Sequence, residues 1–208
     1  NGIKLSDLDI SQIIVFKPYT NLVQGSTSNS AIEELTGTSG NDRIEGGNNP
    51  FDRFGDGNDR LIGGAGDDLL IGGTNQHSTG GYYVDTYVFG DNSGKDQIIG
   101  FLADGTGSNA AYYDRIEILS GINGTNITTS ADVLSRISAN ADGDAVIDLG
   151  GGNSVTLKDI EVDEVKSHHI IISTNDFNEI SNLKPSIITS PLNNINQAAL
   201  YSYTMSGS

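Results

Sequence analysis

The chain has 208 residues, no cysteine, and 27 acidic against 11 basic side chains, which give a net charge of −16. This charge excludes nucleic acid as a partner, because no basic patch is available to neutralise phosphates, and the absence of cysteine excludes disulfides and thiolate metal sites. No run approaches the length of about 18 apolar residues that a transmembrane helix requires, so no transmembrane segment is predicted.

Residues 1–34 are predicted to be short flanking strands and a linker. Residues 3–5 and 13–16 fit short strands, and residues 24–30 form a polar loop of glutamine, glycine, serine, threonine and asparagine. The chain begins at Asn1 without a methionine or a signal peptide. We therefore expect it to be a fragment or a processed piece of a longer protein.

Residues 35–101 carry a nine-residue repeat, Gly-Gly-x-Gly-x-Asp-x-apolar-x. Residues 63–71 match it in full, residues 37–45 and 54–62 each lack one glycine, and residues 80–88 keep the leading glycines, the aspartate and the apolar position. Glycine permits the positive φ of a tight turn, and the last three positions suit a short strand with one inward side chain. Ordinary turns between hairpin strands are the alternative, but four aspartates in one register favour a repeat.

Such short strands predict a stacked fold that needs a metal ion. A three-residue strand cannot stand alone, and a hard cation between neighbouring turns would supply what the thin core lacks. Calcium fits, because it accepts six to eight oxygen ligands at about 2.3–2.6 Å, backbone carbonyls included. In a parallel roll, repeats n and n+2 share a side. We therefore predict two sites, one pairing Asp42 with Asp59 and one pairing Asp68 with Asp85, with degenerate units at residues 46–53 and 72–79 between the partners.

The repeat resembles the calcium-binding nonapeptide of the RTX, or haemolysin-type, family. The resemblance covers about residues 35–173 and implies an all-β fold, a right-handed parallel β-roll closed by an antiparallel β cap. Thr38 and Phe54 replace glycines of the motif, so the first site is expected to be the weaker one. Carried over by position, the implied ligands are carbonyl or carboxylate oxygens of Thr38, Gly40, Asp42, Phe54, Asp56 and Asp59 for one site, and of Gly64, Gly66, Asp68, Gly80, Tyr82 and Asp85 for the other.

Residues 86–101 resemble the segment that closes an RTX roll, with Asp96 as a further implied ligand and Gly100 where the family often has aspartate. Residues 102–173 are predicted to form a β-rich cap over the open end of the roll. Within it we expect a strand at residues 114–119, a helix or strand at 131–137, a hairpin at 145–157 and a last strand at 170–172. Asp142 and Asp144 lack the glutamate of an EF-hand loop and predict a plain turn.

No catalytic motif is present in the sequence, which contains neither His-Glu-x-x-His nor Gly-x-Ser-x-Gly. We therefore expect a chain that is not an enzyme by itself. Two tyrosine pairs, at residues 82–83 and 112–113, fit either packing within the cap or a surface that stacks on sugars. Residues 174–208 turn to asparagine, serine, isoleucine and proline, and predict a linker or C-terminal arm.

The RTX resemblance implies a Gram-negative or cyanobacterial protein that leaves the cell unfolded by type I secretion and folds outside on calcium. With 27 glycines and a net charge of −16, the metal-free chain is expected to be mostly unfolded. We expect a calcium-folded, non-catalytic module of a large secreted or cell-surface protein, such as an adhesin or surface-layer component. The alternatives are the C-terminal roll of a secreted enzyme acting on polysaccharide or protein, with its catalytic domain upstream, and a carbohydrate-binding module.

Overall fold

The computed structural model describes residues 19–25, 32–47, 57–73, 83–103 and 112–174. In these residues, strands make up most of the regular structure, with one short α-helix and three 3-10 turns. The first eight strands are β1 (Asn21–Gln24), β2 (Glu34–Thr36), β3 (Asp42–Glu45), β4 (Arg60–Ile62), β5 (Leu69–Ile71), β6 (Thr86–Phe89), β7 (Lys95–Ile99) and β8 (Arg115–Leu119). They are followed by η4 (Ile122–Gly124), α1 (Ser130–Leu134), β9 (Ile137–Ala139), β10 (Ala145–Gly150), β11 (Asn153–Leu157), η5 (Val162–Glu164), η6 (Ser167–His169) and β12 (Ile170–Ser173).

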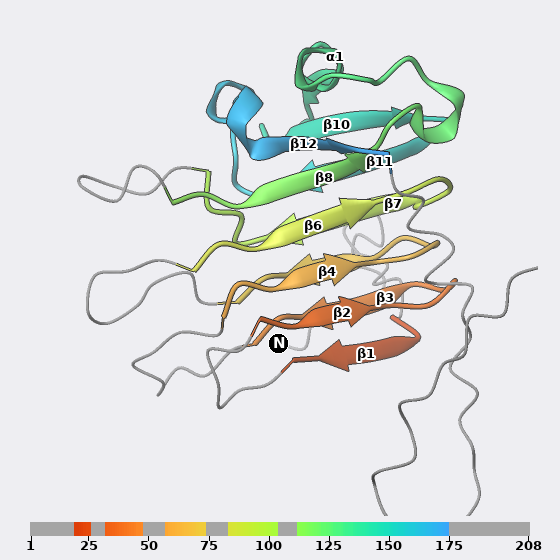
Figure 1. Cartoon of the computed structure of the whole chain (residues 1–208), viewed down its shortest axis with the longest axis vertical. Helices are drawn as coiled ribbons and strands as arrows, with labels where there is room; N and C mark the ends of the chain where they lie inside the picture. Colours follow the sequence, from red (N-terminus) through yellow and green to blue (C-terminus); the bar gives the residue numbers. More distant parts are fainter. Residues whose placement is uncertain (1–18, 26–31, 48–56, 74–82, 104–111, 175–208) are drawn as a thin grey trace, which may run out of the picture.

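From β1 to β8, successive strands alternate between two sheets. The first sheet has the order β1-β3-β5-β7-β11-β10-β9 and the second the order β12-β8-β6-β4-β2. From β1 to β8, every neighbouring pair within a sheet is parallel, and Figure 1 shows the strands stacked one above the next. The chain is therefore an all-β, parallel β-roll, as predicted. Its strand pairing includes β1, which lies in the segment predicted to flank the roll.

The core of the roll lies between the two sheets and is one side chain deep. Because successive residues of a strand face opposite sides, each of the strands β3 to β8 sends a large side chain inward at the position two residues after the aspartate of its turn. These inward side chains, all fully buried, are Ile44, Leu61, Leu70, Tyr87, Ile98 and Ile116.

Two kinds of connection join the sheets. Short turns lead from β2 to β3, from β4 to β5 and from β6 to β7, whereas the return connections to β4, β6 and β8 are longer and include residues 48–56, 74–82 and 104–111, which lie outside the described part of the chain. Residues that stack on one another in successive circuits are consequently 26 to 29 positions apart. This circuit length decides which aspartates meet.

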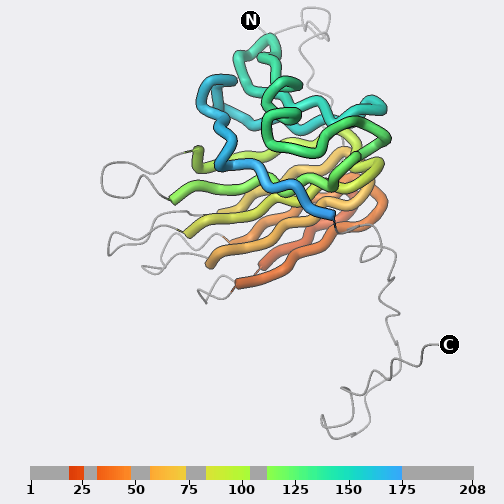
Figure 2. Tube along the Cα trace, turned by 45° about the horizontal axis from the view of Figure 1, so that its top comes forward, coloured from red at the N-terminus to blue at the C-terminus, as the bar shows by residue number. Residues whose placement is uncertain are grey.

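The cap continues both sheets. Strands β10 and β11 form the predicted antiparallel hairpin, β9 pairs antiparallel with β10, and β11 adds to the first sheet parallel to β7. Strand β12 pairs parallel with β8 in the second sheet, so the segment predicted as the cap contains parallel strands as well. Figure 2 shows from a second direction that the cap lies at one end of the stack. Within the described residues no helix is long and apolar enough to cross a membrane.

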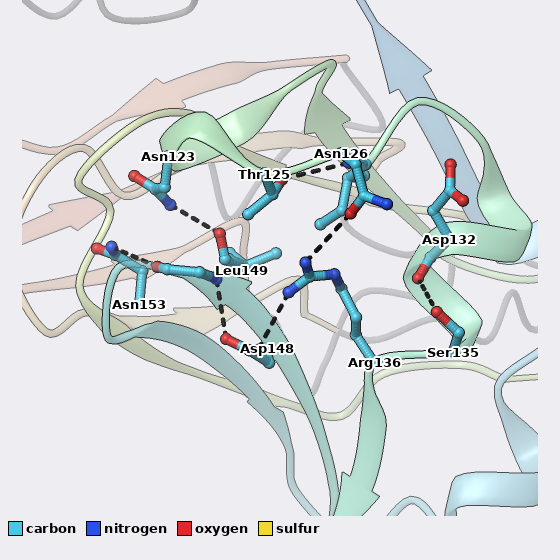
Figure 3. Close-up of polar contacts among 11 residues, drawn as sticks. Asn123, Thr125, Asn126, Asp132, Ser135, Arg136, Asp148, Leu149 and Asn153 are labelled. Carbon is cyan, nitrogen blue, oxygen red and sulfur yellow. Dashed lines mark hydrogen bonds and ion pairs between the residues drawn. The ribbon is translucent and has the colours of Figure 1, made fainter.

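Polar contacts hold the elements of the cap together. The Arg136 guanidinium donates to Asp148 (3.2 Å) and to Asn126 (3.3 Å), and the Asn123 amide donates to the Leu149 carbonyl (3.0 Å), as Figure 3 shows. The segment expected to be a helix or a strand contains both, α1 and β9.

The predicted turn at Asp142 and Asp144 is present. The Lys158 ammonium contacts the Asp144 carboxylate at 2.5 Å. This contact, with a second hydrogen bond from Asn140, lowers the pKa of Asp144 to about 2.

Candidate metal centre

The short turns form a stack, since the strands on either side of them are in register. On Gly64, with φ +96°, an added Cβ would lie 2.1 Å from the Thr38 carbonyl oxygen. On Gly66, with φ +120°, it would lie 2.6 Å from the Gly40 carbonyl oxygen. Only glycine allows the carbonyls of one turn to approach the next turn this closely. The repeat therefore places a series of carbonyl oxygens along one side of the roll.

A column of aspartates runs through the same turns. The Asp42 N–H donates to Oδ1 of Asp68 (2.8 Å), and the Asp68 N–H donates to Oδ1 of Asp96 (2.9 Å). All three side chains are at most 2 % exposed. The carboxylates of Asp68 and Asp96 therefore each tie their own turn to the turn below, and three acidic groups are buried one above another.

A second column stands at the start of the strands of the other sheet. The Asp59 N–H donates to Oδ1 of Asp85 (2.8 Å), and the Asp85 N–H donates to Oδ1 of Asp114 (2.8 Å). The sequence reasoning did not assign Asp114 to a site. The signal was present, because Asp114 stands two residues before the apolar Ile116 in the same register as the repeat aspartates.

The predicted pairing of the aspartates is wrong. Asp42 and Asp59 precede strands of different sheets, as do Asp68 and Asp85; the true neighbours are Asp42 with Asp68 and Asp59 with Asp85, each pair 26 residues apart. The prediction counted residues 46–53 and 72–79 as units with strands of their own. Where those residues are described, they belong to the long return connections. Each long connection carries the chain from one sheet to the other only once, although the prediction counted an additional unit within it.

Two buried carboxylate oxygens lack a partner. Oδ1 of Asp68 and of Asp96 accepts a backbone hydrogen bond, but Oδ2 of each is buried and has no hydrogen-bond partner in the described part of the chain. Burial raises the pKa of Asp68 to about 7 and, against the lowering effect of the nearby Ser93 hydroxyl, that of Asp96 to about 8. A buried anion without a counter-charge is costly, and a bound cation is one way to satisfy it.

The donor set at these turns consists of oxygen. No group of three or more histidine, cysteine, aspartate or glutamate side chains that could hold a metal occurs among the described residues. A cation at the turns would therefore depend on backbone carbonyls for most of its ligands and on one or two carboxylates for the rest. Hard cations with flexible coordination accept such a set, and zinc, which prefers nitrogen and sulfur, does not.

The predicted ligands fall into three groups. The first group comes together in the short-turn stack and contains Thr38, Gly40, Asp42, Gly64, Gly66, Asp68 and Asp96. The second group, Asp59 and Asp85, lies in the other column. The third group lies outside the described residues and contains Phe54, Asp56, Gly80 and Tyr82. Binding of calcium by any of them stays a prediction.

A histidine links the cap to the roll near the last return connection. His169 is fully buried; its Nδ1 accepts the Lys166 N–H (3.0 Å), and its Nε2 contacts the Ala103 carbonyl. An imidazole that accepts at Nδ1 and donates at Nε2 is neutral. Tyr113 packs against His168 with ring centroids 4.3 Å apart, while Tyr112 is 40 % exposed. Within the tyrosine pairs, Tyr113 thus takes part in packing, and Tyr82 lies outside the described residues.

Comparisons with known proteins give fold likenesses only. No protein-family model matches the sequence, and no curated protein matches it. Among solved structures, the extracellular lipase LipA from Serratia marcescens is 19 % identical with a TM-score of 0.47, over 74 % of this chain and 19 % of that chain. The AlgE6R3 subunit of the Azotobacter vinelandii mannuronan C5-epimerase is 22 % identical with a TM-score of 0.30, over 84 % of this chain and 93 % of that chain. The chain thus spans about a fifth of the lipase's length, and its β-roll is defined by its own strand pairing.

Proposed function

We propose that this chain is a calcium-binding module whose roll is completed by calcium ions at the stacked short turns. The observation that carries the proposal is the pair of buried Oδ2 atoms of Asp68 and Asp96, which have no hydrogen-bond partner in the described structure. When bound, calcium would supply the positive charge that these carboxylates lack. The carbonyls of Gly64 and Gly66, together with the two carboxylates, are the groups that would hold it.

The need for a cation follows from charge. Asp42, Asp68 and Asp96 are stacked and buried, and in the described part of the chain no lysine or arginine forms a salt bridge with them. Stacked like charges in a poorly solvated interior repel one another, so the metal-free roll is destabilised by the same groups that define its register. A divalent ion reverses the sign of this interaction.

Calcium suits the site better than magnesium. Magnesium requires nearly ideal octahedral geometry at about 2.0–2.1 Å and keeps several waters, whereas calcium accepts six to eight oxygens in flexible geometry. The carbonyls here are positioned by glycine turns on a peptide backbone and cannot contract around a smaller ion. Affinities of about 10⁻⁴–10⁻³ M, typical of extracellular calcium modules, would keep such a chain unfolded in the cytosol and folded outside.

This coupling supports the wider role that we propose, a non-catalytic module of a secreted or cell-surface protein exported by type I secretion, of the adhesin or surface-layer type. The chain has no cysteine and therefore no disulfide to stabilise it outside the cell. Its core is a single layer of inward side chains between two sheets. A metal ion is the remaining means of stabilising such a fold in an extracellular medium.

A calcium titration tests the proposal. Circular dichroism of the whole chain in excess chelator should show little β signal, and addition of calcium should restore it with a midpoint of about 10⁻⁴–10⁻³ M. Isothermal titration should show saturable calcium binding, and magnesium at the same concentrations should restore much less structure. An equal β signal in chelator and in calcium, with no heat of binding, would refute the proposal.

A further inference from the structure

The short turns at residues 37–42 and 63–68 have equal lengths but different residues at their second position. Gly64 adopts φ +96°, whereas Thr38 is absent from the described non-glycine residues with positive φ, which are Asn92, Asn123 and Asp159. A β-branched residue rarely adopts positive φ. Thr38 therefore forces a different backbone path on an otherwise equivalent turn.

This path changes the surroundings of the carboxylate. The Thr38 N–H and the Thr38 hydroxyl both donate to Oδ2 of Asp42, the latter at 2.9 Å, and the same hydroxyl accepts the Gly40 N–H at 3.1 Å. The equivalent atom in the next turn, Oδ2 of Asp68, has no hydrogen-bond partner among the described residues. One turn thus satisfies its aspartate internally, and the other does not.

Asp42 is also the last carboxylate of its column. In the strand below, Asn21 of β1 lies opposite Asp42 in the parallel register, so no further acid follows. The other column receives such a hydrogen bond at its opposite end, next to the cap, where Oδ2 of Asp114 accepts the Leu102 N–H at 2.9 Å. At one end of each column, the protein itself therefore supplies hydrogen bonds to the final carboxylate.

We propose that Thr38 takes the place of a cation in the first short turn, so that cations on this side of the roll bind at Asp68 and Asp96 and none requires Asp42. This inference rests on the proposed calcium binding and specifies its extent. Thr38 acts through Asp42 and is a positioning residue. To ligate a cation, Oδ2 of Asp42 would have to give up both hydrogen bonds from Thr38. The column of Asp42, Asp68 and Asp96 accordingly closes without metal at its Asp42 end.

Calcium stoichiometry measured on the folded chain by equilibrium dialysis at saturating calcium tests the inference. Asp42→Asn should bind as many calcium ions per chain as the wild type, whereas the matched variant Asp68→Asn should bind at least one fewer. Thr38→Gly, which permits positive φ and removes the hydroxyl, should bind one more. Thr38→Ser keeps the hydroxyl and should match the wild type.

The outcomes separate this inference from the proposed function. If Asp42→Asn loses an ion as Asp68→Asn does, the inference is wrong although calcium binding stands. If the wild type binds no calcium at all, the proposed function fails, and the inference fails with it. Should Thr38→Gly not fold, the comparison of Asp42→Asn with Asp68→Asn still decides the question, because asparagine preserves an oxygen that can accept the backbone N–H in both turns.

Discussion

Replacing Asp68 by asparagine separates the two tasks of this side chain. Its Oδ1 accepts the Asp42 N–H at 2.8 Å, and the amide oxygen of asparagine can keep that hydrogen bond. Its Oδ2 has no hydrogen-bond partner within the described residues, and in Asp68→Asn an uncharged NH₂ group takes its place. The substitution therefore leaves the link between turns intact and removes the charge that would bind calcium.

The size of the effect follows from the interaction that is lost. A contact to a charged group contributes about 1.5–3 kcal/mol, and each 1.4 kcal/mol is about a tenfold change in an equilibrium constant. The calcium midpoint of folding should therefore rise about 10- to 150-fold. In chelator the variant should be at least as stable as the wild type, because it no longer buries an unpaired carboxylate.

The assay is a calcium titration followed by far-ultraviolet circular dichroism, with Asp142→Asn as the control. The Asp142 side chain is 77 % exposed and lies in the turn before β10, so its loss should leave the midpoint unchanged. A midpoint for Asp68→Asn within twofold of the wild type would show that the orphaned oxygen does not meet a cation, and the reasoning from buried carboxylates would be wrong.

Three further substitutions test the cap and the turns. Lys158 lowers the pKa of Asp144 below its ordinary value of 3.8, to about 2. The stability that this carboxylate contributes is therefore complete above about pH 4 and is lost as the pH falls towards 2. In melts over a pH series, Asp144→Asn should lower Tm at pH 7 and have little effect on Tm at pH 2. His169→Leu leaves a backbone N–H and a backbone carbonyl without their buried partner and should cost about 2–5 kcal/mol in urea unfolding at saturating calcium. Gly66→Ala places a methyl group 2.6 Å from a carbonyl oxygen of the turn below. It should destabilise the roll by more than Gly143→Ala, because Gly143 also has positive φ but has open space around it, so that its substitution costs about 1–2 kcal/mol. Equal losses of stability in urea unfolding would contradict the close stacking of the turns.

The repeat register was sufficient to predict the turns, the strands and the inward positions. Gly64 and Gly66 are at the conformations that the motif requires, and Leu70, two residues after Asp68, is fully buried in the core. These features are local, because one unit contains both the turn and the strand that it starts. The part of the candidate site that lies in the short turns was predictable for the same reason.

The pairing of the aspartates was not predictable from the period. From β2 to β8, a short connection of five or six residues and a long one of fourteen or fifteen each carry the chain once from one sheet to the other. Residues 46–53, in a long connection, keep enough of the motif to be counted as a unit. Whether such a segment becomes a strand depends on a partner strand in a neighbouring circuit, which no local pattern contains. The parallel β12 and the attachment of β11 to β7 were missed for this reason too.

In the calcium-bound roll that we propose, the aspartate column would make the effect of each cation non-local. A cation that fixes the Asp96 carboxylate through Oδ2 also fixes its Oδ1, which accepts the Asp68 N–H and so positions the turn at residues 63–68. That turn in turn presents Oδ1 of Asp68 to the Asp42 N–H, where Thr38 completes the series without metal. Each bound ion would therefore order the turn that holds it and the turn below, and the conformational entropy lost in one circuit would lower the cost of ordering the next. A thin core would be sufficient under these conditions, since the hydrogen-bonded carboxylates and their cations would connect circuits that the apolar contacts alone hold weakly.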